Sequence, residues 1–335
     1  TVILEKAMKT NAFRIYKNGG PGELKWETVE VAAPGRGEVL LRHTAIGLNL
    51  ADTYRRTGLY PMPLPNGMGN EAVGVVEAVG PGVRALKVGD RVGYIGGQAF
   101  DAYSKRRVAK VASLIPIPKY IDDRAAAASL LKGITAQYLL RDAYKVKRGD
   151  TILVHAAAGG VGVIMCQWAK ALGATVIGTV STEEKARFAK RNGCHHPIVV
   201  KRKGPKFAKK VRELTNGDGV HCVYDSVGKE TWEESMASVR LRGTVISFGS
   251  ASGKPPLVDI AATGNTGSPF IARCSLVNYT TSRKETMARA DDLFAAIKKG
   301  HVKVQVKQRY KLKDAPKAHR DIEARRTTGS TVLIP

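Results

Sequence analysis

The stretch TILVHAAAGGVG, residues 151–162, decides the fold of this chain. Its first four residues are apolar or β-branched, as in a parallel strand that is covered on both faces. Ala156, Gly159 and Gly162 then form an A-x-x-G-x-x-G run: its two glycines keep the spacing of the last two glycines of a dinucleotide-binding fingerprint, and alanine replaces the first. Such small residues let the chain turn tightly and approach a pyrophosphate, which binds the free N–H groups of the next helix. A glycine-rich turn without a ligand is the alternative interpretation.

Strands and helices alternate from this stretch onward. The helix predicted at Val163–Leu172 ends before Gly173, a residue suited to the end of a helix. Further strands are predicted at Thr175–Val180, Pro197–Val200, Gly219–Asp225, Gly243–Gly249 and Pro269–Cys274. Further helices are predicted at Glu183–Asn192, Lys206–Thr215, Thr231–Val239 and Arg283–Lys299. Six strands with helical crossovers predict an α/β domain with a doubly wound parallel sheet.

The chain before this sheet has a different pattern. Short strands, separated by glycine- and proline-rich turns, are predicted at Val39–Ala45, Glu71–Val79 and Arg91–Tyr94. They indicate a small irregular β-barrel. Two helices are expected after them, at Asp122–Leu131 and Thr135–Ala143. We expect the C-terminal tail to rejoin the barrel, which gives one domain of residues 1–130 and 303–335 and a second of residues 131–302.

Composition narrows the class of protein. With 335 residues, of which 43% are hydrophobic, the chain is long enough for two packed domains. No apolar run reaches the ~18 residues that span a bilayer, and the N-terminus lacks the pattern of a secretory signal. The cysteines stand far apart without a CxxC pair, which indicates reduced thiols and a cytoplasmic location. They are Cys166, Cys194, Cys222 and Cys274.

The net charge of +25 implies attraction to anions such as nucleotide cofactors, nucleic acid or acidic surfaces. Positive charge is densest at Lys201–Arg212, which we interpret as a solvated loop and helix face. Phe207 is the only aromatic residue of that segment, so it offers no stacking platform for single-stranded nucleic acid.

The end of the second strand bears on which nucleotide is bound. In an NAD-specific fold a carboxylate ~20 residues after the glycine turn holds the ribose 2′-hydroxyl. Here the strand ends in Ser181 and Thr182, and Lys185 one helical turn further can reach a 2′-phosphate. Glu183 or Glu184 could turn toward the ribose instead, although acidic residues at a helix start commonly cap it. We therefore expect NADPH.

Seven segments carry a resemblance to a known family. They are AIGLNLADTYRRTGLYP (45–61), GNEAVGVVEAVG (69–80), LLKGITAQYLL (130–140), HAAAGGVG (155–162), VYDSVG (223–228), SFGSASG (247–253) and the closing STVLIP. With them the chain resembles, over nearly its full length, the NADPH-dependent quinone oxidoreductases. These form the zeta-crystallin-like, zinc-free branch of the medium-chain dehydrogenase/reductase superfamily. The resemblance implies a GroES-like irregular β-barrel as catalytic domain and a Rossmann domain that binds NADPH.

Two positions bear on the metal. In the zinc-dependent relatives a cysteine and the histidine of a Gly-His-Glu unit bind the catalytic metal, together with a second cysteine or aspartate. The corresponding places here hold Asn49 and Asn70, and neutral amides are poor zinc ligands. The four closely spaced cysteines of a structural zinc site are also missing. We expect no metal.

The resemblance also implies the residues of the site. The side chains expected to face the substrate are Asn49, Asp52, Tyr54, Arg55, Tyr60 and Arg273. The cofactor is expected to contact Asn49, Tyr138, Ala158, Gly159, Gly160, Val161, Gly162, Ser181, Lys185, Val200, Ser226, Phe248, Gly249, Ser250 and Arg325. Asp52 and Arg55 could instead be an i,i+3 pair on a helix. Tyr54 and Tyr60 could be packing residues, and Arg325 an ordinary helix-face charge.

Val200 departs from the family pattern, because a tyrosine is expected there near the 2′-phosphate. Lys201 or Arg202 could partly replace the lost hydrogen-bond donor.

The predicted reaction is metal-free transfer of a hydride, or of single electrons in steps, from NADPH to a quinone. A quinone that accepts hydride becomes an aryloxide that water can protonate, so a dedicated general acid is unnecessary. Asn49, Tyr54 or Arg55 could donate hydrogen bonds to the developing oxyanion. The alternatives are a reductase of alkenals and alkenones (enones) and an RNA-binding protein. We expect a homodimer in which the strand at Pro269–Cys274 pairs across a two-fold axis.

Overall fold

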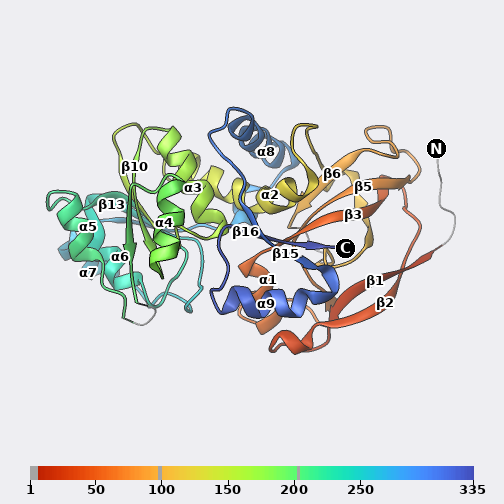
Figure 1. The fold of residues 1–335 in the computed structure, drawn as a ribbon, viewed down its shortest axis with the longest axis horizontal. Helices are drawn as coiled ribbons and strands as arrows, with labels where there is room; N and C mark the ends of the chain where they lie inside the picture. The colour runs from red at the N-terminus through yellow and green to blue at the C-terminus, as the bar shows by residue number, and fades with distance from the viewer. Residues whose placement is uncertain (1–6, 97–99, 202–203) are drawn as a thin grey trace. The chain divides into compact units, whose positions relative to one another are not determined.

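The structure is a computed structural model that describes residues 7–96, 100–201 and 204–335. The chain divides into two compact units, whose elements are labelled in Figure 1. Unit 1 is formed by the described residues within Thr1–Lys132, Ser282–Ala290 and Val304–Pro335, and unit 2 by those within Gly133–Thr281 and Asp291–Lys303. None of the helices in the described ranges combines the length and the apolar character that a bilayer span needs.

Unit 1 consists mainly of antiparallel strands in two sheets. The smaller sheet has the order β2-β1-β4, and the larger one has the order β15-β16-β3-β5-β6-β8, with β7 paired to β3. The strands are β1 (Met8–Ile15), β2 (Lys25–Val31), β3 (Glu38–Leu48), β4 (Asn66–Gly67), β5 (Glu71–Val79), β6 (Arg91–Ile95), β7 (Arg106–Lys110), β8 (Ile115–Pro116), β15 (Val306–Lys311) and β16 (Ser330–Ile334). The C-terminal strand β16 runs antiparallel to β3 and so completes the larger sheet.

The apolar core of unit 1 lies between these strands and helix α9 (Ala315–Glu323). Leu41, Ile46 and Val76 are fully buried in this core, and Ala318 of α9 packs against the same cluster. Helix α1 (Leu50–Thr57) directly follows β3 and contacts α9. The end of β3 therefore places the start of α1 within a buried environment.

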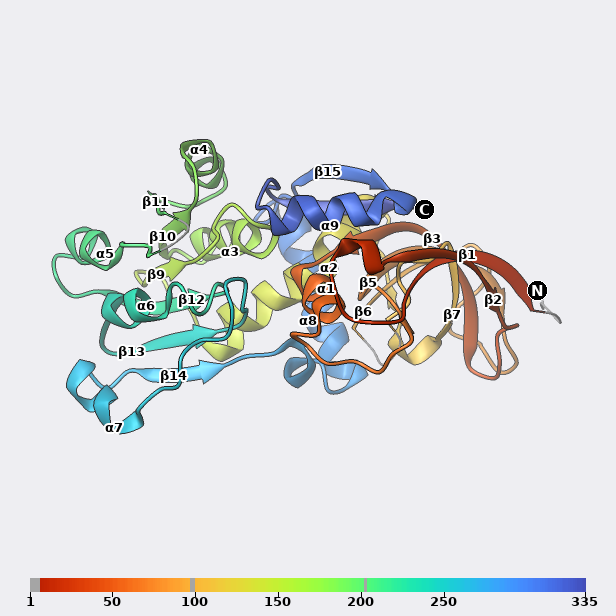
Figure 2. The same cartoon turned by 90° about the horizontal axis from the view of Figure 1, so that it is seen from below.

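Unit 2 contains a parallel six-stranded sheet in the order β11-β10-β9-β12-β13-β14, which Figure 2 shows from β14 to β11. Its strands are β9 (Thr151–Val154), β10 (Thr175–Val180), β11 (His196–Val199), β12 (Val220–Asp225), β13 (Val239–Ser247) and β14 (Phe270–Arg273). Its helices are α3 (Gly160–Ala171), α4 (Glu183–Arg191), α5 (Ala208–Leu214), α6 (Trp232–Ser238) and α7 (Ile260–Thr263). Helices α3 and α4 pack on β9, β10 and β11, and α6 packs on β12 and β13. The predicted doubly wound sheet is confirmed.

The prediction of two helices between the strands of the two units is wrong. The segments Asp122–Leu131 and Thr135–Ala143 form one continuous helix, α2 (Asp123–Tyr138), which ends in a π-helical turn at Leu139–Ala143. Gly133, between the two expected helices, costs only ~1 kcal/mol in a helix interior, and the burial of its neighbours Leu130 and Ile134 offsets that cost. Helix α8 (Arg283–Lys298) agrees with its prediction.

Candidate functional site

The predicted fingerprint forms a tight turn at the carboxyl end of β9. Ala156 has a left-handed backbone with φ of 51°, and the N–H of Gly159 donates to its carbonyl at 2.8 Å. Gly159 is the N-cap of α3, so the N–H groups of Gly160, Val161 and Gly162 belong to the first turn of the helix. Such N–H groups have no carbonyl acceptor within the helix and can bind an anion.

Gly162 tests whether this turn fits a pyrophosphate cradle. A Cβ at Gly162 would lie 2.3 Å from the carbonyl oxygen of Ala156 and 2.8 Å from Cα of Ala157, both of which are backbone atoms. The helix therefore approaches the preceding strand as closely as the fingerprint requires. At Gly159 the closest approach of such a Cβ is 3.2 Å, also to the Ala156 oxygen. The turn fits the nucleotide-binding role.

The end of β10 carries hydroxyl groups, as predicted. The hydroxyl of Thr182 accepts from the N–H of Lys185 at 3.2 Å, which makes Thr182 the N-cap of α4. Ser181 and Lys185 are both half-buried. Val200 follows β11, donates its N–H to the Val180 carbonyl at 2.9 Å and packs on the apolar core of the sheet.

Of the two candidate substitutes for the missing tyrosine, Lys201 is exposed. Arg202 lies outside the described residues. Whether either residue meets a 2′-phosphate stays a prediction.

The carboxyl ends of β12, β13 and β14 bring predicted cofactor residues together with Arg273, which is predicted to face the substrate. Arg273 at the end of β14 donates through Nη1 to the Ser247 hydroxyl at 2.9 Å and to the Gly249 carbonyl at 3.0 Å. The N–H of Ala251 donates to the Ser226 carbonyl at 3.3 Å. Ser226, Phe248, Gly249, Ser250 and Arg273 thus lie along the same edge of the sheet as the fingerprint turn. Ligands of open parallel sheets bind at this edge.

Tyr138 lies at the C-terminal end of α2 and is only 2% exposed. Its ring stacks on that of Tyr279, with centroids 4.2 Å apart and an interplanar angle of 6°. Burial raises the pKa of its hydroxyl group. Contact between Tyr138 and a cofactor stays a prediction.

In unit 1, the predicted substrate-facing residues gather around the start of α1. The carboxylate of Asp52 is fully buried and is surrounded by hydrogen-bond donors. Its Oδ2 accepts from the N–H of Asn49 at 2.9 Å and from the Tyr103 hydroxyl at 3.1 Å. Its Oδ1 accepts from Nδ2 of Asn70 at 2.8 Å. The Tyr103 hydroxyl is also 3.0 Å from Nε2 of the buried His319.

Asn49 belongs to a second buried carboxylate cluster. Its Nδ2 donates to Oε2 of Glu71 at 2.9 Å and to the Gly47 carbonyl at 3.4 Å. Glu71 also accepts from the N–H of Leu131 at 2.7 Å and forms an ion pair with Lys132 at 3.4 Å. The two asparagines therefore use their amide protons on carboxylates, where the zinc-dependent relatives are expected to use metal ligands.

Burial raises the pKa of Asp52 to about 6, against the lowering effect of the Asn49 N–H, Arg55, Tyr103 and Lys132. The carboxyl group is consequently ionised at neutral pH, which agrees with the three donors that surround it. The hydrogen bonds of Asp52 come from Asn49, Asn70 and Tyr103, while Arg55, three residues further along α1, acts on the carboxylate through its charge.

Arg55, Tyr54 and Tyr60 complete the predicted group in unit 1. The guanidinium carbon of Arg55 is 4.2 Å from the centroid of the Phe100 ring. Its Nη1 is buried and has no hydrogen-bond partner in the part of the chain that the structure describes. Tyr54 and Tyr60 are half-buried and meet edge to face, with centroids 5.1 Å apart.

Arg325 follows α9 with a left-handed backbone, φ being 59°. Its neighbour Arg326 forms an ion pair with Asp321. The predicted contact between Arg325 and the cofactor stays a prediction.

Sequence reasoning did not identify Glu71, Lys132, Tyr103 and His319 as parts of the unit 1 cluster. For Glu71 a signal existed, because it follows Asn70 directly at the place of a lost zinc ligand. Tyr103 and His319 carry no local signal, since Tyr103 reaches Asp52, and His319 reaches Tyr103, from positions far along the chain.

Comparison with known proteins agrees with these arrangements. Residues 35–147 match the family described as "Alcohol dehydrogenase GroES-like domain", and residues 160–295 match "Zinc-binding dehydrogenase". The chain is 48% identical over 318 residues to a quinone oxidoreductase of Pseudomonas aeruginosa, which covers 95% of this chain and 97% of the relative. The chain belongs to the quinone oxidoreductase family. The family resemblance and the predicted GroES-like and Rossmann fold are thereby confirmed.

Two further proteins are similar to this chain over nearly its full length. The crystal structure of Escherichia coli quinone oxidoreductase complexed with NADPH has a TM-score of 0.93 and 43% identity, and the match covers 97% of this chain and all of that one. A 2-haloacrylate reductase of a Burkholderia species is 47% identical over 96% of this chain and 98% of its own length.

One matching family is described as zinc-binding, whereas asparagines stand at the corresponding places of this chain. Within residues 7–96, 100–201 and 204–335, no three His, Cys, Asp or Glu side chains come together as a metal-binding group. At the corresponding places Asn49 and Asn70 hold Glu71 and Asp52 through amide protons.

Proposed function

We propose that this quinone oxidoreductase family member uses NADPH to reduce quinones without a metal. The observation that carries the proposal is the turn at Ala156–Gly162. It places the N–H groups of the first turn of α3 at the carboxyl edge of a six-stranded parallel sheet. We assign residues 131–302 as the NADPH-binding domain and residues 1–130 with 303–335 as the catalytic domain. When bound, NADPH supplies a hydride or single electrons.

Lys185 is proposed to select NADPH over NADH. The β10 end offers the hydroxyl groups of Ser181 and Thr182, and Thr182 caps the helix on which Lys185 lies. A lysine that binds a phosphate contributes a charge-assisted hydrogen bond worth ~1.5–3 kcal/mol. Lys185→Ala should therefore raise the KM for NADPH by about tenfold or more and leave the KM for NADH unchanged.

Lys201→Ala tests the proposed substitute for the missing tyrosine. If Lys201 approaches the 2′-phosphate, its removal should weaken NADPH binding and flatten the dependence of that binding on salt. An affinity and a salt dependence equal to those of the wild type would exclude this role.

Arg55 is proposed to stabilise the negative charge that develops on a quinone oxygen. Its Nη1 is a buried hydrogen-bond donor that finds no acceptor among the described residues. Asn49, by contrast, already donates to Glu71 and Gly47 through its amide. Arg55→Met should lower kcat for a quinone by about tenfold or more, with the dissociation constant of NADPH unchanged. An unchanged kcat would remove Arg55 from the site.

Reduction of activated alkenes is the second candidate function. Its support is the 47% identity to a 2-haloacrylate reductase, whose name states a carbon–carbon double bond as the target. Assays of NADPH oxidation with a quinone panel and with 2-haloacrylates and α,β-unsaturated ketones separate the two. A higher kcat/KM for the alkenes would replace the quinone proposal.

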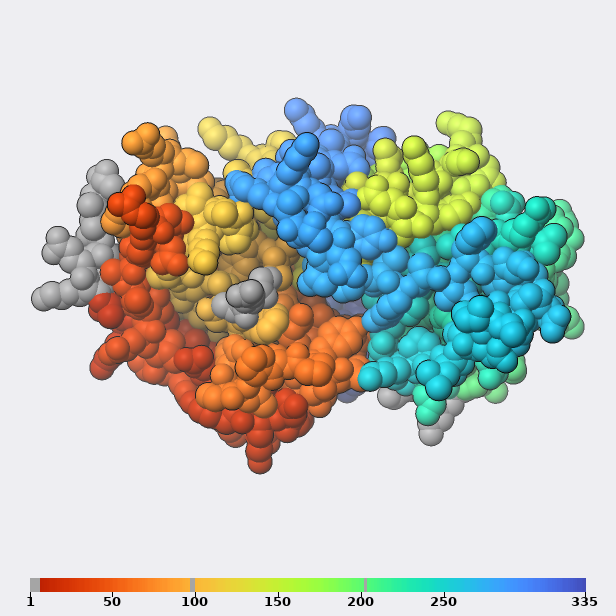
Figure 3. Space-filling model, turned by 180° about the vertical axis from the view of Figure 1, so that it is seen from behind, coloured from red at the N-terminus to blue at the C-terminus, as the bar shows by residue number. Residues whose placement is uncertain are grey.

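We also propose a homodimer that forms through β14. This strand is the edge of the sheet, and Phe270 on it is 68% exposed. Leu241 and Ile260 nearby in unit 2 are also largely exposed, and Figure 3 shows the segment of α7 and β14, coloured cyan to blue, on an open face of that unit. Pairing of two β14 edges would cover these groups. Phe270→Lys should convert a dimer, measured by analytical ultracentrifugation, into a monomer.

The proposed location is the cytoplasm. All four cysteines are free and buried, which suits a reducing compartment.

A further inference from the structure

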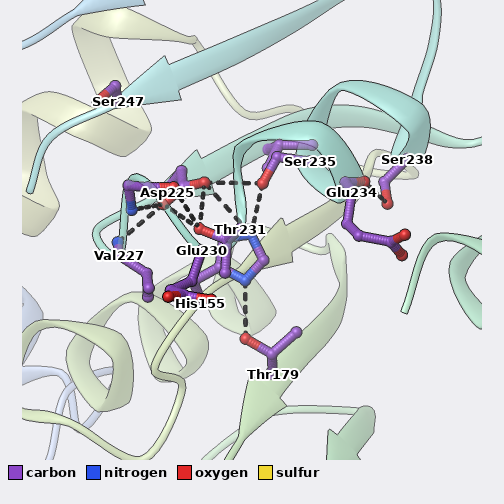
Figure 4. A network of polar contacts seen from close by, with 12 residues as sticks. His155, Thr179, Asp225, Val227, Glu230, Thr231, Glu234, Ser235, Ser238 and Ser247 are labelled. Carbon is purple, nitrogen blue, oxygen red and sulfur yellow. Dashed lines mark hydrogen bonds and ion pairs between the residues drawn. The ribbon is translucent and has the colours of Figure 1, made fainter. Parts of the chain in front are cut away.

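A buried chain of polar groups links three neighbouring strands of unit 2 beside the fingerprint turn (Figure 4). His155 follows β9, Thr179 lies in β10, Asp225 ends β12, and Ser235 lies on α6. Nδ1 of His155 is 2.7 Å from the Thr179 hydroxyl, and its Nε2 is 2.8 Å from the Ser235 hydroxyl. The Ser235 hydroxyl donates to Oδ2 of Asp225 at 2.8 Å.

The donor and the acceptor of each hydrogen bond among Thr179, His155, Ser235 and Asp225 follow from the single hydroxyl proton of Ser235. Because that proton goes to Asp225, the Ser235 oxygen must accept from Nε2–H of His155. Burial lowers the pKa of His155, so the ring is neutral and carries only this one proton. Its Nδ1 is therefore an acceptor, and the Thr179 hydroxyl must donate to it.

Asp225 anchors the far end of the chain. Its Oδ1 accepts from the N–H groups of Val227 and Gly228 at 2.8 and 2.9 Å, and the Thr231 hydroxyl donates to the same carboxylate. All of the partners that reach Asp225 are donors, and Asp225 itself is fully buried. The carboxylate is thus a fixed point from which Ser235 orients the ring of His155.

Thr179 forms hydrogen bonds with both residues that flank Ala156, namely His155 and Ala157. Its hydroxyl binds the side chain of His155, and its carbonyl accepts from the N–H of Ala157 at 3.0 Å. Ala156 between them has a φ of 51°, which an alanine adopts only when its surroundings enforce it. The hydrogen bonds of Thr179 to His155 and Ala157 restrain the backbone on both sides of Ala156.

We infer that Ser235 is a positioning residue for NADPH binding: by orienting His155 from Asp225, it holds Ala156 in the backbone conformation that aims the helix N–H groups at the pyrophosphate. This inference rests on the proposed function. The hydrogen bonds of Ser235 go to His155 and Asp225, so its influence on Ala156 passes through His155.

A matched pair of serines on α6 tests the inference. Ser235 and Ser238 are both buried, but the Ser238 hydroxyl donates to the Glu234 carbonyl at 2.7 Å, within its own helix. Ser235→Ala should raise the dissociation constant of NADPH, measured by calorimetry, by about tenfold, whereas Ser238→Ala should not. Equal constants for the two variants would overturn the inference.

Ala156→Gly provides a rescue that a merely structural role of Ser235 would not show. Glycine adopts a positive φ without strain, so the turn no longer needs the network. In the Ser235→Ala background, Ala156→Gly should restore NADPH affinity to within about twofold of the wild type. Failure to restore it would show that Ser235 does not act through Ala156.

The Thr179 pair keeps the inference testable if Ser235→Ala does not fold. Thr179→Val preserves the shape of the side chain but removes the hydroxyl, while Thr179→Ser preserves the hydroxyl. Only the valine variant should weaken NADPH binding. Equal binding by both variants would contradict the inference.

The protonation of His155 gives a readout without NADPH. In ¹⁵N spectra of the protein labelled at histidine, the Nδ1 resonance of His155 should be that of an unprotonated nitrogen, and Ser235→Ala should alter it. A proton on Nδ1 in the wild type would overturn the derived direction of the chain. If the wild type bound no NADPH at all, the proposed function would fail, while these spectra would still test the network.

Discussion

The buried carboxyl group of Asp52 should make the stability of this protein depend on pH in an unusual direction. Burial raises the pKa of Asp52 from 3.8 to about 6 in the folded protein, although three donors surround the carboxylate. A group whose pKa is higher in the folded state holds its proton there while the unfolded chain has already lost it. Lowering the pH through this window therefore favours the folded state.

The size of the effect follows from the shift. A difference of about two pKa units corresponds to about 3 kcal/mol of unfolding free energy. This contribution is fully present below pH ~4, declines as the pH rises, and is lost above pH ~6. Other titrating groups add their own dependence, so the contribution of Asp52 must be isolated by a variant.

Urea unfolding between pH 4 and 7 provides the assay, with wild type compared to Asp52→Asn. The asparagine does not titrate, so the stability of wild type minus that of the variant should increase by about 3 kcal/mol from pH 7 to pH 4. Asp259→Asn, at an exposed helix cap, is the control for the loss of a carboxylate outside the buried cluster. A constant difference for Asp52→Asn would refute the raised pKa, and a decrease toward acid would show that the donors outweigh burial.

Two further predictions follow from close contacts. Gly162→Ala should weaken NADPH binding far more than Gly159→Ala. The new Cβ at residue 162 would collide with backbone atoms, including the Ala156 oxygen at 2.3 Å, whereas the Cβ at residue 159 would lie 3.2 Å from that oxygen. Calorimetric titration of both variants with NADPH checks this, and equal affinities would contradict it. Glu323→Gln should lower the free energy of unfolding by about 3 kcal/mol, because it removes the negative charge that pairs with Arg56, whose side chain is only 1% exposed. Urea unfolding of the variant and the wild type measures this loss. A loss below ~1 kcal/mol would show that water compensates the charge of Arg56.

Local patterns in the sequence were enough to predict the Rossmann sheet. Strands β9, β10 and β12 are short, largely apolar segments, and helices α3 and α4 begin at the caps Gly159 and Thr182. The turn at Gly162 and the cap at Thr182 depend on contacts within a few residues, so their spacing indicated their geometry.

Long-range contacts were beyond sequence reasoning. Strands β1, β2 and β7 lack strong apolar alternation and are held by their pairing partners, so no local pattern predicted them. Tyr103 and His319 reach the buried cluster from 51 and 216 residues away, counted from Asp52 and from Tyr103. The continuous helix α2 was divided in prediction because the burial of its middle residues is a tertiary property.

The amide groups at Asn49 and Asn70 have a consequence for the evolution of this protein. A single change of Asn70 to histidine would remove the donor to Asp52, and a single change of Asn49 to cysteine would remove a donor to Glu71. Each intermediate would leave a buried carboxylate short of a partner and would lose stability before any metal could be gained. Gain of a zinc site at these two positions would thus require several substitutions together, because each amide supports a buried carboxylate.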